Sequence, residues 1–154
     1  MPTKLYMDSA RLALESTILE RYLPRRYAFV HPTDSSRSYL DVGLKTKSGN
    51  TYRLKILIPP DYPSAMPLVY VVHPKPLYDY HKQDLTSIGA SGKMHVLTSA
   101  DGCVQLCHFK GSLWHTNITL YKVALKCLIW LEAYHNHLLT GNDIDYYLRH
   151  CPQH

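Results

Sequence analysis

A chain of 154 residues has the length of one globular domain, and its hydrophobic fraction of 45% is ordinary for such a domain. Four cysteines are too few for the disulfide framework of a small secreted protein. The formal net charge of +5 permits an acidic partner without requiring one. We therefore predict a single domain over residues 1–154, with free thiols.

The beginning of the chain has none of the features of a secretory signal. Charges run through residues 1–27, and this stretch contains no apolar segment of the kind found in signal peptides. The longest apolar runs are far shorter than the roughly 20 residues that span a bilayer. The basic residues are scattered, and no nucleic-acid-binding motif is present. We expect a cytoplasmic protein that neither spans a membrane nor binds nucleic acid.

An amphipathic helix is predicted over residues 8–23, because Leu12, Ile18, Leu19 and Leu23 give an apolar stripe and Pro24 ends it. Four strands are predicted next. The clearest alternates apolar and polar residues, and the sequence KSGN before it is typical of a hairpin turn. The predicted strands cover residues 27–31, 38–44, 51–58 and 67–72.

A long irregular region is predicted over residues 73–114, where prolines and glycines are frequent. A long helix follows, capped by Thr116 or Asn117 and ended by Gly141. This order of elements predicts an α+β fold in which helices cover one face of a four-stranded antiparallel sheet. The apolar face of the long helix is predicted to comprise Leu120, Val123, Ala124, Cys127, Leu128, Leu131, Tyr134 and Leu138.

The segment DGCVQLCHFKGSLW, residues 101–114, concentrates reactive side chains. A cysteine thiolate can attack a carbonyl carbon and hold the acyl group as a thioester, which divides one difficult transfer into two easier steps. A zinc site built from Cys103, Cys107, His108 and His95 is the alternative, but their spacing fits no paired-ligand motif. We expect no metal and no cofactor.

The prolines between the last two predicted strands carry a resemblance. Residues 59–72, PPDYPSAMPLVYVV, resemble the Pro-x-x-Tyr-Pro connection of ubiquitin-conjugating enzymes, with Pro59, Tyr62, Pro63, Pro67 and Val69 at matching positions. Prolines suit a rigid crossover because they fix φ and cannot join a sheet ladder. The resemblance implies a ubiquitin-conjugating-enzyme-like (UBC-like) fold: an N-terminal helix, a four-stranded antiparallel sheet, a long active-site loop and C-terminal helices.

The same family has a His-Pro-Asn element, then a catalytic cysteine, then a tryptophan before a helix. Here Cys107 lies 12 residues after His95 and 7 before Trp114, whereas Cys103 lies 11 before Trp114 and fits less well. The resemblance therefore implies that Cys107 is the nucleophile, and we expect Cys103 to be its inert neighbour in the loop. Of the other two cysteines, Cys127 is predicted to lie in the core and Cys151 in the tail.

Other residues near the cysteine are candidates for supporting roles. His95 could orient the loop or transfer protons, and His108 and His115 could favour the thiolate, as could the nearby start of a helix. In an extended segment His108 would point away from Cys107, which favours a surface position. Trp114 is expected to anchor the loop by packing. The family's oxyanion-stabilising asparagine falls at Leu97, and Asn117 is a candidate substitute.

The C-terminal half, with IWLEAY and TGN, resembles the conjugating-enzyme relatives encoded with antiphage (CBASS) nucleotidyltransferases. This resemblance implies a thioester with the C-terminus of the nucleotidyltransferase, with or without a separate activating enzyme, in antiviral defence. The alternative is a catalytically inactive domain of the same fold that binds or regulates a partner.

Overall fold

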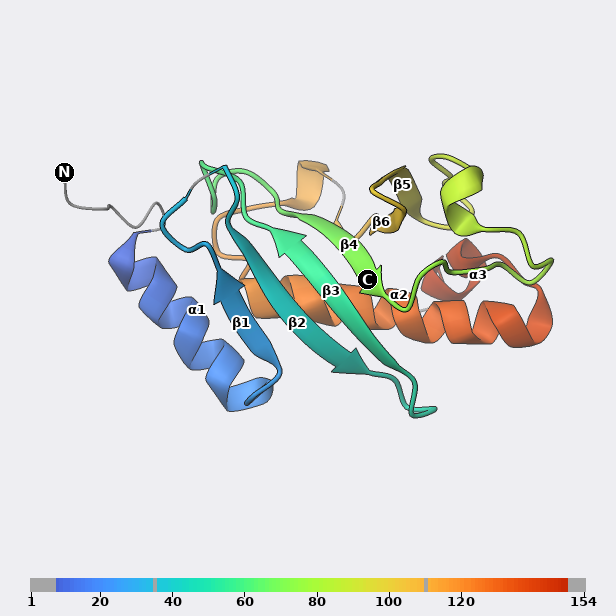
Figure 1. Ribbon diagram of the computed structural model, residues 1–154, viewed down its shortest axis with the longest axis horizontal. Coiled ribbons are helices and arrows are strands. Elements are labelled where there is room, and N and C mark those ends of the chain that lie inside the picture. Colours follow the sequence, from blue (N-terminus) through green and yellow to red (C-terminus); the bar gives the residue numbers. More distant parts are fainter. Residues whose placement is uncertain (1–7, 35, 110, 150–154) are drawn as a thin grey trace.

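A six-stranded antiparallel sheet, in the order β1-β2-β3-β4-β6-β5, forms the centre of the molecule. In the computed structural model, which describes residues 8–34, 36–109 and 111–149, the long helix α2 crosses one face of the sheet (Figure 1). The elements are α1 (Ser9–Tyr22), β1 (Tyr27–Val30), β2 (Tyr39–Lys45), β3 (Thr51–Leu57), β4 (Leu68–His73), β5 (Val96–Ala100), β6 (Cys103–Leu106), α2 (Leu120–Thr140) and α3 (Ile144–Arg149), with short 3-10 turns at Leu85–Ser87 and Gly111–Leu113. The α+β class is confirmed.

The sheet has two more strands than predicted. All four expected strands are present, but β5 and β6 form a hairpin inside the region predicted to be irregular, and β6 pairs with β4. The turn between them contains Asp101 and Gly102, both at positive φ, which is the conformation that a tight hairpin requires. These strands are short, and all four residues of β6 are buried. A short strand that is buried on both faces lacks the alternating pattern by which strands are recognised.

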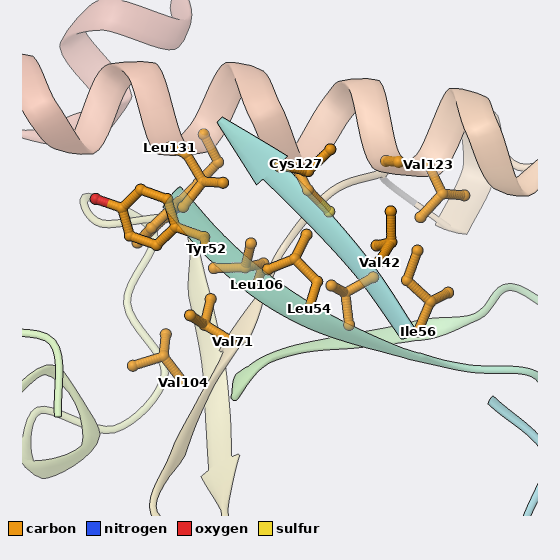
Figure 2. Close-up of a cluster of buried hydrophobic side chains, with 14 of the residues drawn as sticks. Val42, Tyr52, Leu54, Ile56, Val71, Val104, Leu106, Val123, Cys127 and Leu131 are labelled. Carbon is orange, nitrogen blue, oxygen red and sulfur yellow. The ribbon is translucent and has the colours of Figure 1, made fainter. Parts of the chain in front are cut away.

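The hydrophobic core lies between the sheet and α2. Residues Tyr52 to Ile58 alternate as predicted, with every second side chain buried on the helix side. Figure 2 shows side chains from four strands pointing toward α2, where Cys127 and Leu131 are fully buried. The apolar face predicted for this helix is confirmed, except that Leu138, near its end, is 39% exposed and Leu128, in its middle, is only partly buried.

The two ends of α2 are held by specific contacts. The N-cap is Thr119, whose hydroxyl accepts a hydrogen bond from the Lys122 N–H, so the predicted cap at Thr116 or Asn117 was wrong. Gly141 ends the helix as predicted, with a φ of 81° that favours glycine. Within the described part of the chain, no helix is long and apolar enough to cross a membrane.

A buried ionic cluster joins α1 to the start of α2. Glu15 is fully buried, and its carboxylate accepts hydrogen bonds from Arg11 (3.1 Å), from the Tyr62 hydroxyl and from the Leu120 N–H (3.0 Å). Burial, together with the Glu15 carboxylate, raises the pKa of Tyr62. Arg11 also donates to the carbonyl oxygen of Ile118, at 2.7 Å. The cluster therefore fixes the chain just before α2.

Candidate functional site

Cys107 lines a cavity of about 370 Å³ at the end of the β5–β6 hairpin. His95 and His108 line the same cavity from the hairpin side, and Asp145 lines it from α3. Cys107 is partly exposed, whereas Cys103 and Cys127 are buried. The structure thus brings Cys107 and His95 to one site, and Cys107 is the accessible thiol among the described cysteines.

The hairpin register holds Cys107 beside His95. Val96 pairs with Leu106 at the end of the β5–β6 ladder, so the next residues outward, His95 and Cys107, lie opposite each other. The Cys107 N–H donates a hydrogen bond of 3.0 Å to the His95 carbonyl oxygen. His95 itself adopts a positive φ of 52° as the chain enters the strand.

Asp145 orients the His95 ring from the other side. Its Oδ1 lies 2.7 Å from His95 Nε2, and its Oδ2 lies 2.9 Å from Arg149 Nε. The hydrogen bond from His95 holds the pKa of the Asp145 carboxyl below its ordinary value, and the charge of Arg149 acts in the same direction. The backbone also positions Asp145, because its N–H donates to the Lys93 carbonyl oxygen at 2.8 Å.

Asp145 has a role that the sequence did not indicate. It lies 50 residues after His95, in the first turn of a helix of six residues. An acidic residue in a first helical turn is usual for helix stability, so its position gave no separate signal. Only the folded position of α3, which packs on α2 and reaches the turn before β5, reveals the contact.

His108 is buried, so the predicted surface position was wrong. Only 8% of the residue is exposed, and both ring nitrogens are buried. Burial lowers the pKa of His108 to about 4, although backbone groups of Leu106 and Pro67 favour the protonated ring. The alternation rule does not extend to His108, because β6 ends at Leu106. His108 and Cys107 therefore line the same cavity.

Cys103 lies in strand β6, not in a loop. It is 7% exposed and outside the cavity lining, and its Sγ atom lies 3.8 Å from Lys75 Nζ. The prediction that Cys127 belongs to the core is confirmed, and burial raises the pKa of its thiol. The predicted tail residue, Cys151, falls outside the described residues.

Three further candidates lie outside the cavity lining. Trp114 packs against Phe109, with ring centroids 5.8 Å apart, and its Nε1 donates to the Pro63 carbonyl oxygen at 2.9 Å. It therefore anchors the chain between the cavity and α2. Asn117 and His115 are exposed and contact each other through the Asn117 N–H. Leu97, on β5, does not line the cavity either.

The described residues contain no group of three His, Cys, Asp or Glu side chains that could hold a metal ion. No family model, curated protein or solved structure matches the chain. The chemistry of the site is therefore argued from its geometry. A thiol and an imidazole that a carboxylate orients line one cavity, and Lys126 and Arg149 bring positive charge to it. This arrangement suits nucleophilic attack by sulfur on a carbonyl carbon.

Proposed function

We propose that the protein is a ubiquitin-conjugating-enzyme-like transferase in which Cys107 accepts an acyl group as a thioester. One observation carries the proposal: the accessible thiol shares a cavity with His95, whose ring is held by Asp145. A nucleophile, a base and a residue that orients the base form the usual arrangement for covalent acyl transfer.

The roles follow from the hydrogen bonds. A proton on His95 Nε2, donated to Asp145, leaves Nδ1 as the basic nitrogen of a neutral ring. His95 takes the proton of the Cys107 thiol, and the resulting thiolate attacks the carbonyl carbon of an activated acyl donor, itself a thioester. A new S–C bond forms, and the S–C bond of the donor breaks. The departing thiolate takes the proton back from the imidazole.

The proposal includes the UBC-like fold. A helix followed by the meander β1–β4, with the Pro59–Pro63 connection before β4, supports it. The β5–β6 hairpin extends this sheet beyond the four strands of the family, and it carries the nucleophile at its end. Trp114 packed beneath the chain after Cys107 also fits the family pattern.

The resemblance supplies the proposed partner. The acyl group would be the C-terminus of a CBASS nucleotidyltransferase, delivered with or without an activating enzyme, and its conjugation would serve antiphage defence. We propose a cytoplasmic location for this reaction, as for its partner.

Acylation by a short peptide thioester ending in glycine tests the proposal. We expect mass spectrometry to place the peptide on Cys107, in a bond that free thiols cleave. Cys107→Ser should give a stabler ester or no adduct, and Cys103→Ser is the matched control that should react like the wild type. Loss of the adduct in Cys103→Ser alone would mean that the nucleophile is assigned to the wrong cysteine.

The role of the orienting carboxylate is tested separately. Asp145→Asn should slow acylation by roughly 10²-fold or more, because an amide does not fix the same imidazole tautomer. Asp143→Asn, in the exposed segment just before α3, is the control. If the wild-type protein is never acylated by this donor or by an activated partner, the binding-domain alternative is favoured instead.

A further inference from the structure

We infer that the open face of the sheet, which is turned away from α2, binds an acidic segment of a partner protein and holds one of its carboxylates between Arg26 and Arg53. This inference goes beyond the proposed function, because it assigns a second surface of the molecule. The residues that line the hollows of this face do not line the cavity that contains Cys107. No described helix covers this side of strands β1–β4 (Figure 1).

The strand register aligns four residues in one row across the open face. Gly43 pairs with Arg53, and Arg53 pairs with His73 on the next strand. On the other side of the row, the Gly43 N–H donates to the Arg26 carbonyl oxygen at 2.8 Å. Residues directly opposite each other in antiparallel strands project from the same face of the sheet. Because the neighbouring Val42 is fully buried on the side of α2, this row projects from the open face.

The middle of this row is a slot with a guanidinium group on either side. Gly43 has no side chain, whereas Arg26 is exposed and the Arg53 side chain is 61% exposed. Since the two arginines are two strands apart, their Cα atoms are separated by about 10 Å. Two hollows, of about 340 and 360 Å³, share Arg26, Gly43 and Arg53 in their linings. A carboxylate between two guanidinium groups accepts charge-assisted hydrogen bonds from both.

Positive charge predominates around this slot. Asp41 is the one acidic residue in the linings of the two hollows, and its carboxylate already pairs with Arg53. Opposite charges across an interface attract partners and select among them, so this face favours an acidic partner. The cationic side chains come from β2, β3 and the residues before β1, and they are Arg25, Arg26, Lys45, Arg53 and Lys55.

The other groups of the open face favour a protein over a nucleic acid. The Asp41 carboxylate repels phosphates but can accept hydrogen bonds from a polypeptide. Lys55 Nζ lies 4.4 Å from the centre of the Tyr39 ring, and the Tyr70 hydroxyl donates to Gln105 at 3.3 Å. Arginine and tyrosine are enriched in protein interfaces, where donors and acceptors are mixed, whereas nucleic-acid binding relies on neutralising successive phosphates.

Fluorescence anisotropy with a labelled polyglutamate peptide, at low ionic strength, tests this surface on the full chain. Arg26→Gln should weaken binding about tenfold, because a charged hydrogen-bond donor to the carboxylate is lost. Arg21→Gln, at an exposed arginine on α1, is the matched control. It changes the net charge of the chain by the same amount and should bind like the wild type.

A substitution in the slot gives a second, independent test. A Cβ atom at Gly43 would meet only the Arg26 carbonyl oxygen, at 3.9 Å, so a side chain can be added there without a clash. Gly43→Glu should prevent binding, because its own carboxylate lies between the two guanidinium groups. Gly43→Gln fills the same space without the charge and should bind more tightly than Gly43→Glu. Circular dichroism checks that both variants are folded.

The outcomes separate a specific site from general attraction between charges. Failure of the wild type to bind the peptide, or equal losses of affinity in Arg21→Gln and Arg26→Gln, would overturn the inference. Equal affinities of Gly43→Glu and the wild type would also overturn it. Tighter binding of a single-stranded DNA of similar length, weakened by Arg26→Gln, would overturn it in favour of a nucleic acid.

Discussion

Removing the buried carboxylate of Glu15 should destabilise the protein more than any change on the exposed side of α1. Glu15→Ala deletes the acceptor for the Arg11 guanidinium, the Tyr62 hydroxyl and the Leu120 N–H at once. The Leu120 N–H belongs to the first turn of α2, where backbone donors have no partner inside the helix. The substitution therefore removes the carboxylate that faces the Arg11 cation and leaves a buried backbone donor without its acceptor.

The size of the effect follows from the burial of the two charges. Loss of one partner of a buried ion pair costs about 3–5 kcal/mol. The Arg11 side chain keeps 13% exposure and its hydrogen bond to the Ile118 carbonyl oxygen, which places the expected loss at the lower end, about 3 kcal/mol. For a urea slope of about 2 kcal/mol/M, the unfolding midpoint should fall by about 1.5 M.

Urea unfolding followed by circular dichroism measures this loss, with Glu20→Ala as the matched control. Glu20 lies on the same helix, is exposed, and accepts one hydrogen bond from the Tyr27 hydroxyl. Its removal should change stability by less than about 0.5 kcal/mol. If Glu15→Ala and Glu20→Ala unfold at the same urea concentration, the ionic cluster does not hold α1 to α2, and the reasoning fails.

Two further predictions concern the core and pH. Leu131→Ala should lower the free energy of unfolding by about 2–5 kcal/mol, because the side chain is fully buried between α2 and the sheet. Leu139→Ala, at a position that is 67% exposed, should have little effect. Equal urea midpoints for the two variants would show that this helix face is wrongly assigned. Burial lowers the pKa of His108 from 6.5 in the unfolded chain to about 4 in the folded protein. Between these two pH values the unfolded chain binds more protons, so the free energy of unfolding should fall by roughly 3 kcal/mol as the pH is lowered through this window. His108→Phe should remove that component of the slope of unfolding free energy against pH, and an unchanged slope would contradict the burial of the ring.

The sequence predicted those elements whose residues repeat with a clear period. Thr51–Leu57 alternates, and the apolar residues of α2 recur at helical spacing, so both were placed within a few residues. The hairpin β5–β6 was missed because its strands are short, and one of them is buried on both faces. Its turn, with Asp101 followed by Gly102, was the available signal.

The candidate site was predicted in the same uneven way. His95 and Cys107 were singled out from their spacing, and the hairpin places them side by side. The direction of His108 could not be predicted, because it depends on where β6 ends, and a strand boundary is the least certain feature of a sequence pattern. Asp145 could not be predicted because its contact with His95 depends on how a distant helix packs.

The contact between His95 and Asp145 makes the site depend on a short helix that lies far from the hairpin in the sequence. The hairpin brings His95 and Cys107 together from nearby in the sequence, but the carboxylate arrives on α3, which is held by two buried side chains, Ile144 and Leu148. Short elements held by few buried side chains can open at a free energy well below that of global unfolding. Detachment of α3 would thus leave the thiol and the imidazole in place but release the imidazole from its carboxylate. A binding partner that displaces α3 would therefore change the reactivity of the Cys107 thiol without unfolding the sheet.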